Sequence, residues 1–221
     1  MSIYVERGKI PHKRHTQFKN PKGGFFFEEL VSREGFSYNY SNLYHIHRPT
    51  NLTNVGSFHS LKLSKFDTSH YPMHLRTASI SPSGDAINSR LDLFYNNDVK
   101  ISKSHFREKM DYFYRNAHYD EMFYIQKGNG RLNTNYGCLD YIEGDFLIIP
   151  RGVICKLEPI SLTHALICET QGPIQFPKKY RSRVGQLLEH SPYCERDIHL
   201  PNLLNPKDKM GDFLVKVKLR N

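Results

Sequence analysis

Two histidines at alternate positions, His45 and His47, are the first residues whose types and spacing could do chemistry. Alternate side chains of a β-strand point to the same face, so both imidazole rings would share one side of a strand. Imidazole nitrogens bind divalent metals, and His12, His15 or His59 could supply a third ligand. No carboxylate lies near the pair in the sequence, and strand histidines are more often hydrogen-bonded to neighbours. The pattern leaves a metal site and a structural role open.

A second candidate is Glu121, which opens a pair of spaced glycine motifs. Glu121 is followed by six residues and Gly128, and further along Gly144–Asp145 is followed by four residues and Pro150–Gly152. Glycine permits the tight turns that join neighbouring strands. This paired spacing resembles the two motifs of a cupin jelly roll, a small barrel of antiparallel strands. The resemblance implies that both motifs belong to one barrel.

Most metal ligands of the cupin pattern are replaced in this sequence. Metal-binding cupins carry two histidines shortly before the glutamate and a third after the second glycine motif, and together these hold a divalent metal. The three histidine positions here hold Tyr114, Asn116 and Cys155, with Arg115 and Ala117 at the first two in the shorter register. Only Glu121 remains. A structural barrel filled by aromatic side chains is therefore favoured over a metal site.

Other reactive residues form no recognisable constellation. His118 lies three residues from Glu121, and this odd offset places the two on opposite faces of a regular strand. Cys155 as a nucleophile would need a neighbouring base and a lowered pKa, so a buried, inert thiol is expected. Asp111 and Glu143 do not complete an acid/base pair with Glu121. The four cysteines show no CxxC spacing, which favours reduced thiols in the cytosol: Cys138, Cys155, Cys168 and Cys194.

The composition of the chain indicates which classes of binding partner to expect. The chain has 221 residues and a formal net charge of +9, which raises nucleic acid as a partner. The basic excess lies in residues 1–48 and 176–221, while residues 49–175 are balanced, and no nucleic-acid-binding motif occurs. No apolar run approaches the roughly 18 residues of a membrane span, and the first residues lack a signal-peptide pattern. We therefore expect a cytoplasmic protein that binds neither nucleic acid nor membranes.

The pattern of strands predicts a mainly β fold. Short apolar or alternating runs are separated by glycine or asparagine turns, without a convincing long amphipathic helix, which is typical of an antiparallel sandwich or barrel. We expect a cupin-type jelly-roll barrel or sandwich at 89–176. An N-terminal strap with an irregular segment covers 1–88, and a C-terminal extension covers 177–221. The expected elements are strands at 25–27, 43–47, 90–95, 99–101, 121–127, 131–135, 139–150, 153–157, 165–169 and 213–218, and a short helix at 184–189.

Nearly the whole chain resembles homogentisate 1,2-dioxygenase, with a poor match at 51–88. The resemblance is carried by residues 7–18, 28–36, 43–50, 114–130, 144–152, 185–192 and 213–218. It implies a cytosolic enzyme of tyrosine and phenylalanine catabolism. That family uses Fe(II) and O2 to open the ring of homogentisate, giving maleylacetoacetate. Two histidines and one glutamate hold the iron, and members assemble as trimers and often hexamers.

The resemblance also implies where the chemistry of that family lies. Its iron ligands belong to a C-terminal cupin, and the sequence ends at Asn221, before that part begins. No catalytic, metal-binding or cofactor-binding residue is therefore assigned, and we expect an N-terminal scaffold that meets a small aromatic substrate only together with a C-terminal half. Three alternatives stay open. They are a non-catalytic binding or oligomerisation module, a small metal-dependent cupin using His45 and His47, and a fragment that needs its other half.

Overall fold

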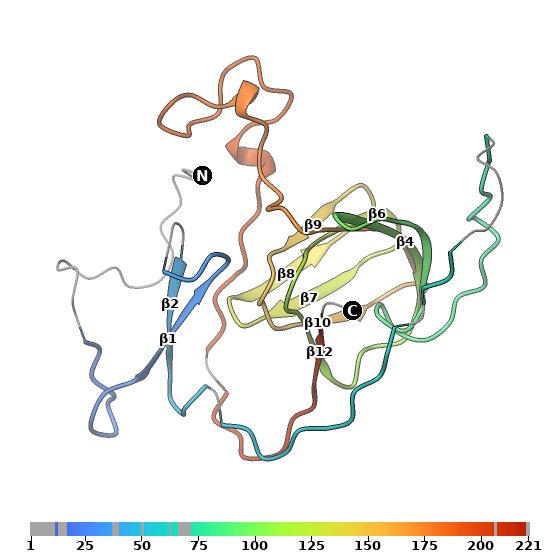
Figure 1. Cartoon of the computed structure of the whole chain (residues 1–221). Coiled ribbons are helices and arrows are strands. Elements are labelled where there is room, and N and C mark those ends of the chain that lie inside the picture. The colour runs from blue at the N-terminus through green and yellow to red at the C-terminus, as the bar shows by residue number, and fades with distance from the viewer. Residues whose placement is uncertain are drawn as a thin grey trace. The chain divides into compact units, whose positions relative to one another are not determined.

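The computed structural model describes residues 12, 17–36, 40–49, 51–61, 63–65, 72–205 and 207–219 (Figure 1). The chain divides into two units. The first comprises residues 1–55 and 175–213, and the second comprises residues 56–174 and 214–221. Among the described residues, no helix is both long enough and apolar enough to cross a bilayer.

The second unit contains two five-stranded sheets (Figure 1). Neighbouring strands pair antiparallel, except that β12 joins β5 in parallel. One sheet has the order β12-β5-β10-β7-β8 and the other the order β3-β4-β11-β6-β9. The strands are β3 Arg90–Tyr95, β4 Val99–Phe106, β5 Phe113–Asn116, β6 Asp120–Lys127, β7 Gly130–Thr134, β8 Gly137–Tyr141, β9 Phe146–Ile149, β10 Cys155–Pro159, β11 Thr163–Thr170 and β12 Val215–Lys218.

The core lies between the inner faces of these two sheets. Along β11, buried and half-buried residues alternate without a break, so that one face of the strand is fully covered. Phe123 and Ile167 from one sheet and Leu132 and Leu157 from the other belong to the same buried cluster. Aromatic side chains supply much of its volume, as expected for a barrel filled by aromatic residues: Phe106, Tyr112, Tyr114, Phe123 and Tyr141.

The first unit contains a β-hairpin and two short 3-10 helices. Strand β1, Phe27–Ser32, pairs antiparallel with β2, Tyr40–His45. The 3-10 helices are η1, Lys178–Tyr180, and η2, Glu195–Asp197.

The prediction of a short helix at 184–189 is wrong. Arg181 and Leu187 form an antiparallel bridge around a turn, and the Ser182 N–H donates to the Gln186 carbonyl. Gly185 adopts φ +87°, which a right-handed helix does not allow. The backbone therefore reverses where the apolar spacing suggested a helix.

The mainly β prediction is confirmed, and the predicted strands between 90 and 170 are present with shifted ends, except that residues 139–150 form two strands, β8 and β9, separated by a turn. The described residues between 51 and 88 contain neither helix nor strand, as expected. Sequence reasoning missed β5, a strand of only four residues.

Candidate functional site

The residues at the cupin ligand positions do come together inside the barrel. Tyr114 of β5 lies opposite Cys155 of β10 in the sheet. The Tyr114 hydroxyl donates to Glu121 Oε1 at 2.7 Å, and Asn116 Nδ2 donates to the same oxygen at 2.8 Å. Glu121 is 1% exposed. The spacing read from the sequence thus correctly places four side chains around one point, but none of the three expected histidine positions holds an imidazole.

A guanidinium from another strand completes the site. Arg90, the first residue of β3, donates from Nη1 to Glu121 Oε1 at 3.0 Å and from Nη2 to Glu121 Oε2 at 2.8 Å. Such a two-pronged arrangement is the strong form of an arginine–carboxylate pair. The guanidinium also lies over the rings of Tyr114, at 5.4 Å, and Phe123, at 5.2 Å. Arg90 therefore fills the space in front of the glutamate.

Glu169 of β11 is a second carboxylate at this point. Arg90 Nη1 donates to Glu169 Oε1 at 3.2 Å, and Asn116 Nδ2 donates to Glu169 Oε2 at 3.1 Å. Lys100 forms an ion pair with Glu169 Oε1 at 3.3 Å, and Lys218 of β12 forms another with Oε2. We call the following residues the charge cluster: Arg90, Lys100, Tyr114, Asn116, Glu121, Glu169 and Lys218.

Sequence reasoning missed Arg90, Glu169 and Lys218. The alternation at 90–95 predicted a strand but did not show which residues face inward: Leu91 is 49% exposed and the Arg90 side chain 7%. Lys218 reaches the cluster only because β12 adds to β5 from the far end of the chain. One signal was available for Glu169, which stands at an inward position of a strongly apolar strand.

Burial and pairing shift the protonation equilibria of the cluster. Burial by itself would raise the pKa of Glu121, but the Arg90 charge and the hydrogen bonds from Arg90, Asn116 and Tyr114 outweigh it and lower that pKa to about 2. Burial lowers the pKa of Lys218 to about 8 against the opposing charge of Glu169, and the neighbouring Lys100 adds to the lowering. Burial, followed by the charge of Glu121, raises the pKa of the Tyr114 hydroxyl. The site is therefore an ionised, hydrogen-bonded network at neutral pH.

We predict that this network loses stability in acid. Because the folded-state pKa of Glu121 lies below its ordinary value, the ionised carboxylate stabilises the fold above about pH 5. That contribution, on the order of 3 kcal/mol, is lost as the pH falls toward 2. Urea unfolding at pH values from about 2 to about 7 measures this loss. Glu121→Gln should show a flatter pH profile than the unsubstituted chain, and equal slopes would contradict the assignment.

The iron that the resemblance implies does not fit these residues. A site of that kind needs two imidazoles beside the carboxylate, and the positions hold a phenol, an amide and a thiol at Tyr114, Asn116 and Cys155. Both oxygens of Glu121 are already bound by a permanently charged guanidinium. Across the part of the chain that the structure describes, no group of three or more His, Cys, Asp or Glu side chains could hold a metal ion.

Cys155 has the environment of an inert thiol. It is 1% exposed. Burial, together with the nearby charge of Glu121, raises its pKa to about 12, and Arg90 offsets this only in part. A thiol at neutral pH is a poor nucleophile. The four described cysteines are free.

The histidine pair does not form a shared site. Strand β2 ends at His45, so His47 lies in a bend and the two no longer alternate on one strand. His45 Nε2 contacts Glu29 at 2.8 Å, while His47 Nε2 contacts Asp208 at 2.6 Å. Each ring is thus paired with a different carboxylate. His12 and His59 are exposed, and His15 lies outside the described residues.

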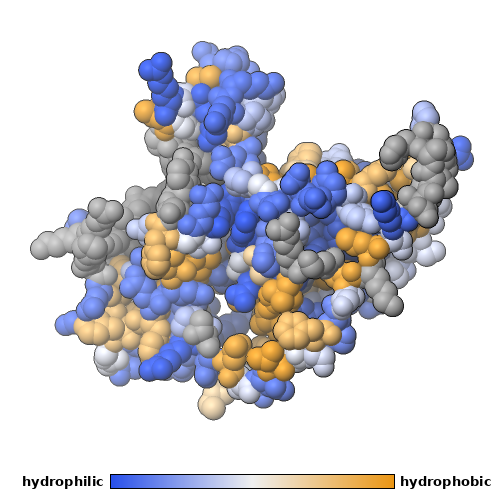
Figure 2. Space-filling model, in the orientation of Figure 1, coloured by the Kyte–Doolittle hydropathy of each residue, from blue (hydrophilic) through white to orange (hydrophobic). Residues whose placement is uncertain are grey.

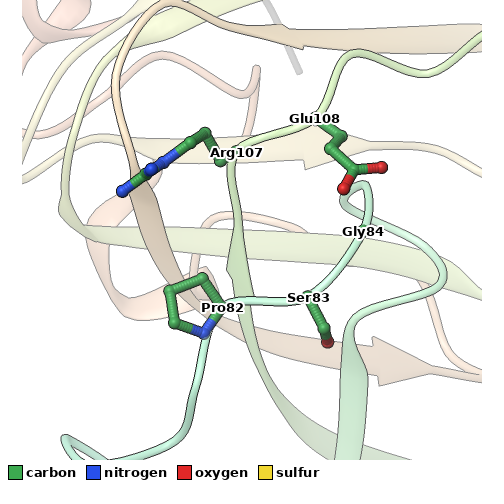
Figure 3. A pocket seen from close by; sticks show the side chains of 5 residues that line it. All are labelled: Pro82, Ser83, Gly84, Arg107 and Glu108. Carbon is green, nitrogen blue, oxygen red and sulfur yellow. The ribbon is translucent and has the colours of Figure 1, made fainter.

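Two hollows lie on the second unit. One, of about 350 Å³, is lined by the loop Pro82–Gly84 and by Arg107 and Glu108, whose side chains point to opposite sides (Figure 3). The other, of about 270 Å³, borders the charge cluster and is lined by Lys100, Glu169 and Lys218 among others. The second hollow therefore borders the buried network.

Two mainly antiparallel sheets packed over one core, with glycine turns at the spaced motifs, define a cupin-like sandwich. A scan against models of protein families gives no match.

The whole length of the chain is similar to part of one longer protein. It is 34% identical over 223 aligned residues to "Putative dioxygenase SSO1533" of Saccharolobus solfataricus, covering 100% of this chain and 57% of that protein. A shorter match joins it to "Homogentisate 1,2-dioxygenase" of Bradyrhizobium diazoefficiens, with 36% identity over 67 residues, which is 30% of this chain and 15% of that protein. The chain thus spans little more than half the length of the first relative and a small part of the second.

Some solved structures of cupin proteins align with part of this chain, with low TM-scores. A cupin-2 domain protein of Shewanella frigidimarina aligns with a TM-score of 0.34 and 20% identity, covering 37% of this chain and 79% of that one. A cupin protein of Bacteroides fragilis aligns with a TM-score of 0.35 and 14% identity, covering 47% of this chain and 94% of that one.

Proposed function

We propose that this chain supplies a metal-free cupin barrel of a ring-cleaving dioxygenase of the homogentisate type. The observation that carries the proposal is the guanidinium of Arg90, which binds both oxygens of Glu121 where a metal-binding cupin would hold its metal. The relationship to a dioxygenase over the whole chain supports it, and so does the short match to homogentisate 1,2-dioxygenase. In this proposal the chain is a scaffold for the reaction and does not hold the reacting atoms.

The proposed reaction is the Fe(II)- and O2-dependent opening of homogentisate to maleylacetoacetate, with iron and substrate bound by a separate, histidine-bearing cupin. The barrel described here would contribute a rigid body against which that cupin folds or assembles. Its ionised network, closed by β12, suits such a role because a saturated set of buried hydrogen bonds specifies one arrangement of the strands.

Oxygen uptake tests the proposal. The purified chain with Fe(II) and homogentisate should consume oxygen no faster than a metal-only blank. Adding the part of the Saccharolobus relative that lies outside the matched region should give ring cleavage, measured by the absorbance of maleylacetoacetate. Ring cleavage by the chain alone would overturn the scaffold role. Equal activity of the added part without the chain would also overturn it.

A non-catalytic oligomerisation role is the second candidate, and the outer face of the β3-β4-β11-β6-β9 sheet favours it. The strand register aligns a row of apolar side chains across all five strands: Phe94, Ile101, Cys168, Met122 and Ile148. A solvent-facing sheet surface is normally polar. At its ends Phe94 is 51% and Ile148 41% exposed, and Phe146 beside it is 60% exposed. Figure 2 shows that apolar side chains also gather in separate groups on the face in view.

We predict that this row mediates association of copies of the chain as trimers or hexamers. Sedimentation velocity should show an oligomer that Phe146→Asp and Ile148→Asp together convert to a smaller species, since a buried charge without a partner is costly. Ile160→Asp is the matched control, because Ile160 is 74% exposed in a turn outside the row. A monomeric unsubstituted chain, or equal effects of both variants, would contradict the prediction.

A further inference from the structure

We propose that Arg90 is the resident cation of this barrel, which does permanently what a bound metal does in metal-binding cupins. It holds two buried carboxylates and their hydrogen-bond donors in one arrangement, and its guanidinium marks a cation site. The inference goes beyond the scaffold role and does not depend on it, because it concerns only the contacts inside the second unit.

The strand register shows why a cation is required at this point. Glu121 of β6 and Glu169 of β11 lie directly opposite each other on neighbouring strands. Both are 1% exposed and point into the core. Like charges directly across a strand pair destabilise a sheet, and burial makes the repulsion stronger. Two ionised carboxylates can occupy these positions only if a positive charge lies between them.

One nitrogen of the Arg90 guanidinium contacts both carboxylates. Nη1 is 3.0 Å from Glu121 Oε1 and 3.2 Å from Glu169 Oε1, so one atom bridges both carboxylates. Asn116 Nδ2 makes a parallel bridge, at 2.8 Å to Glu121 and 3.1 Å to Glu169. The converging donors and acceptors thus share one centre, as ligands do around a metal.

The other cations near the site do not substitute for Arg90. The ion pairs of Lys100 and Lys218 run to Glu169, from the side of the solvent-bordering hollow. Lys100 also forms an ion pair with Asp92 at 3.1 Å, so the lysine charge is shared between two carboxylates. Glu121 has no lysine partner among the ion pairs of the described residues. Removing Arg90 would therefore leave the buried Glu121 carboxyl without a cation, which costs stability whether the group stays ionised or takes up a proton.

Chemical rescue tests the proposal. Arg90→Ala removes the guanidinium and leaves space at the shared centre. Methylguanidinium should restore its thermal stability because it replaces the lost group, and Mn²⁺ should do so because carboxylate oxygens suit that ion. At roughly a hundredfold excess of either cation over its dissociation constant, we expect Tm to rise by about 5–10 °C. The unsubstituted chain should show no such rise.

Electron paramagnetic resonance measures Mn²⁺ binding directly, which would not change if Arg90 only stabilised the fold by packing. Arg90→Ala should bind one Mn²⁺ per chain, seen as loss of the free-ion signal, and Arg90→Ala with Glu121→Gln should bind at least roughly tenfold more weakly. If Arg90→Ala does not fold by itself, recovery of its circular dichroism on refolding with either cation replaces the melting curve. Failure of both cations to rescue, or equal rescue of the double variant, overturns the proposal. The oxygen-uptake test is unaffected by either result.

Discussion

Replacing Arg90 with methionine is expected to lower the free energy of unfolding by about 3–5 kcal/mol. Methionine keeps most of the apolar stem of the side chain, so the change removes the charge and its hydrogen bonds more than the packing. Both Glu121 and Glu169 are 1% exposed and would lose their shared partner. Urea denaturation at about pH 7, where carboxylates are ordinarily ionised, measures the loss.

A surface pair of similar geometry is the matched control. Arg131 donates to Asp140 at 2.6 and 3.2 Å, but the two side chains are 50% and 63% exposed. Exposed ion pairs contribute about 0–1 kcal/mol, so Arg131→Met should have little effect. Adding Glu121→Gln to Arg90→Met should recover part of the loss, because it removes the uncompensated charge. Equal losses in Arg90→Met and Arg131→Met would show that burial does not govern the pair.

Gly128→Ala is expected to be the other severe substitution, with a loss of about 3 kcal/mol or more from backbone strain and overpacking together. Gly128 has φ +94°, a conformation that side chains disfavour, and a Cβ there would lie 2.4 Å from the Leu162 carbonyl oxygen and 2.8 Å from Thr163 Cα. Both are backbone atoms, so relief requires moving the start of β11. Denaturant unfolding of the purified variant measures the loss.

Gly144 separates the two causes. Its φ is +93°, nearly that of Gly128, yet nothing lies within 4 Å of the added Cβ. Gly144→Ala should therefore show only the strain, about 1–2 kcal/mol. The difference between the two variants measures the close approach of the chain. Equal losses of stability in Gly128→Ala and Gly144→Ala would show that the close contacts around Gly128 contribute nothing to the effect.

The local pattern of the sequence was sufficient for the strands and for part of the site. Period-two alternation and glycine turns are local signals, so most strands from 90 to 170 could be predicted, with shifted ends, whereas the four-residue strand β5 was missed. The motif spacing likewise placed Tyr114, Asn116, Glu121 and Cys155 around one point. The helix expected at 184–189 failed because apolar spacing does not reveal the positive φ of Gly185.

The sequence by itself determined a mainly β chain, the glycine turns of its motifs and the loss of the histidine ligands beside Glu121. Only the tertiary structure decided what compensates that carboxylate. Arg90 lies 31 residues before Glu121, Glu169 lies 79 residues after Arg90, and Lys218 lies 49 residues after Glu169. Sheet pairing brings these distant charges together, and their interaction depends on burial in a medium that screens poorly, which no local pattern encodes.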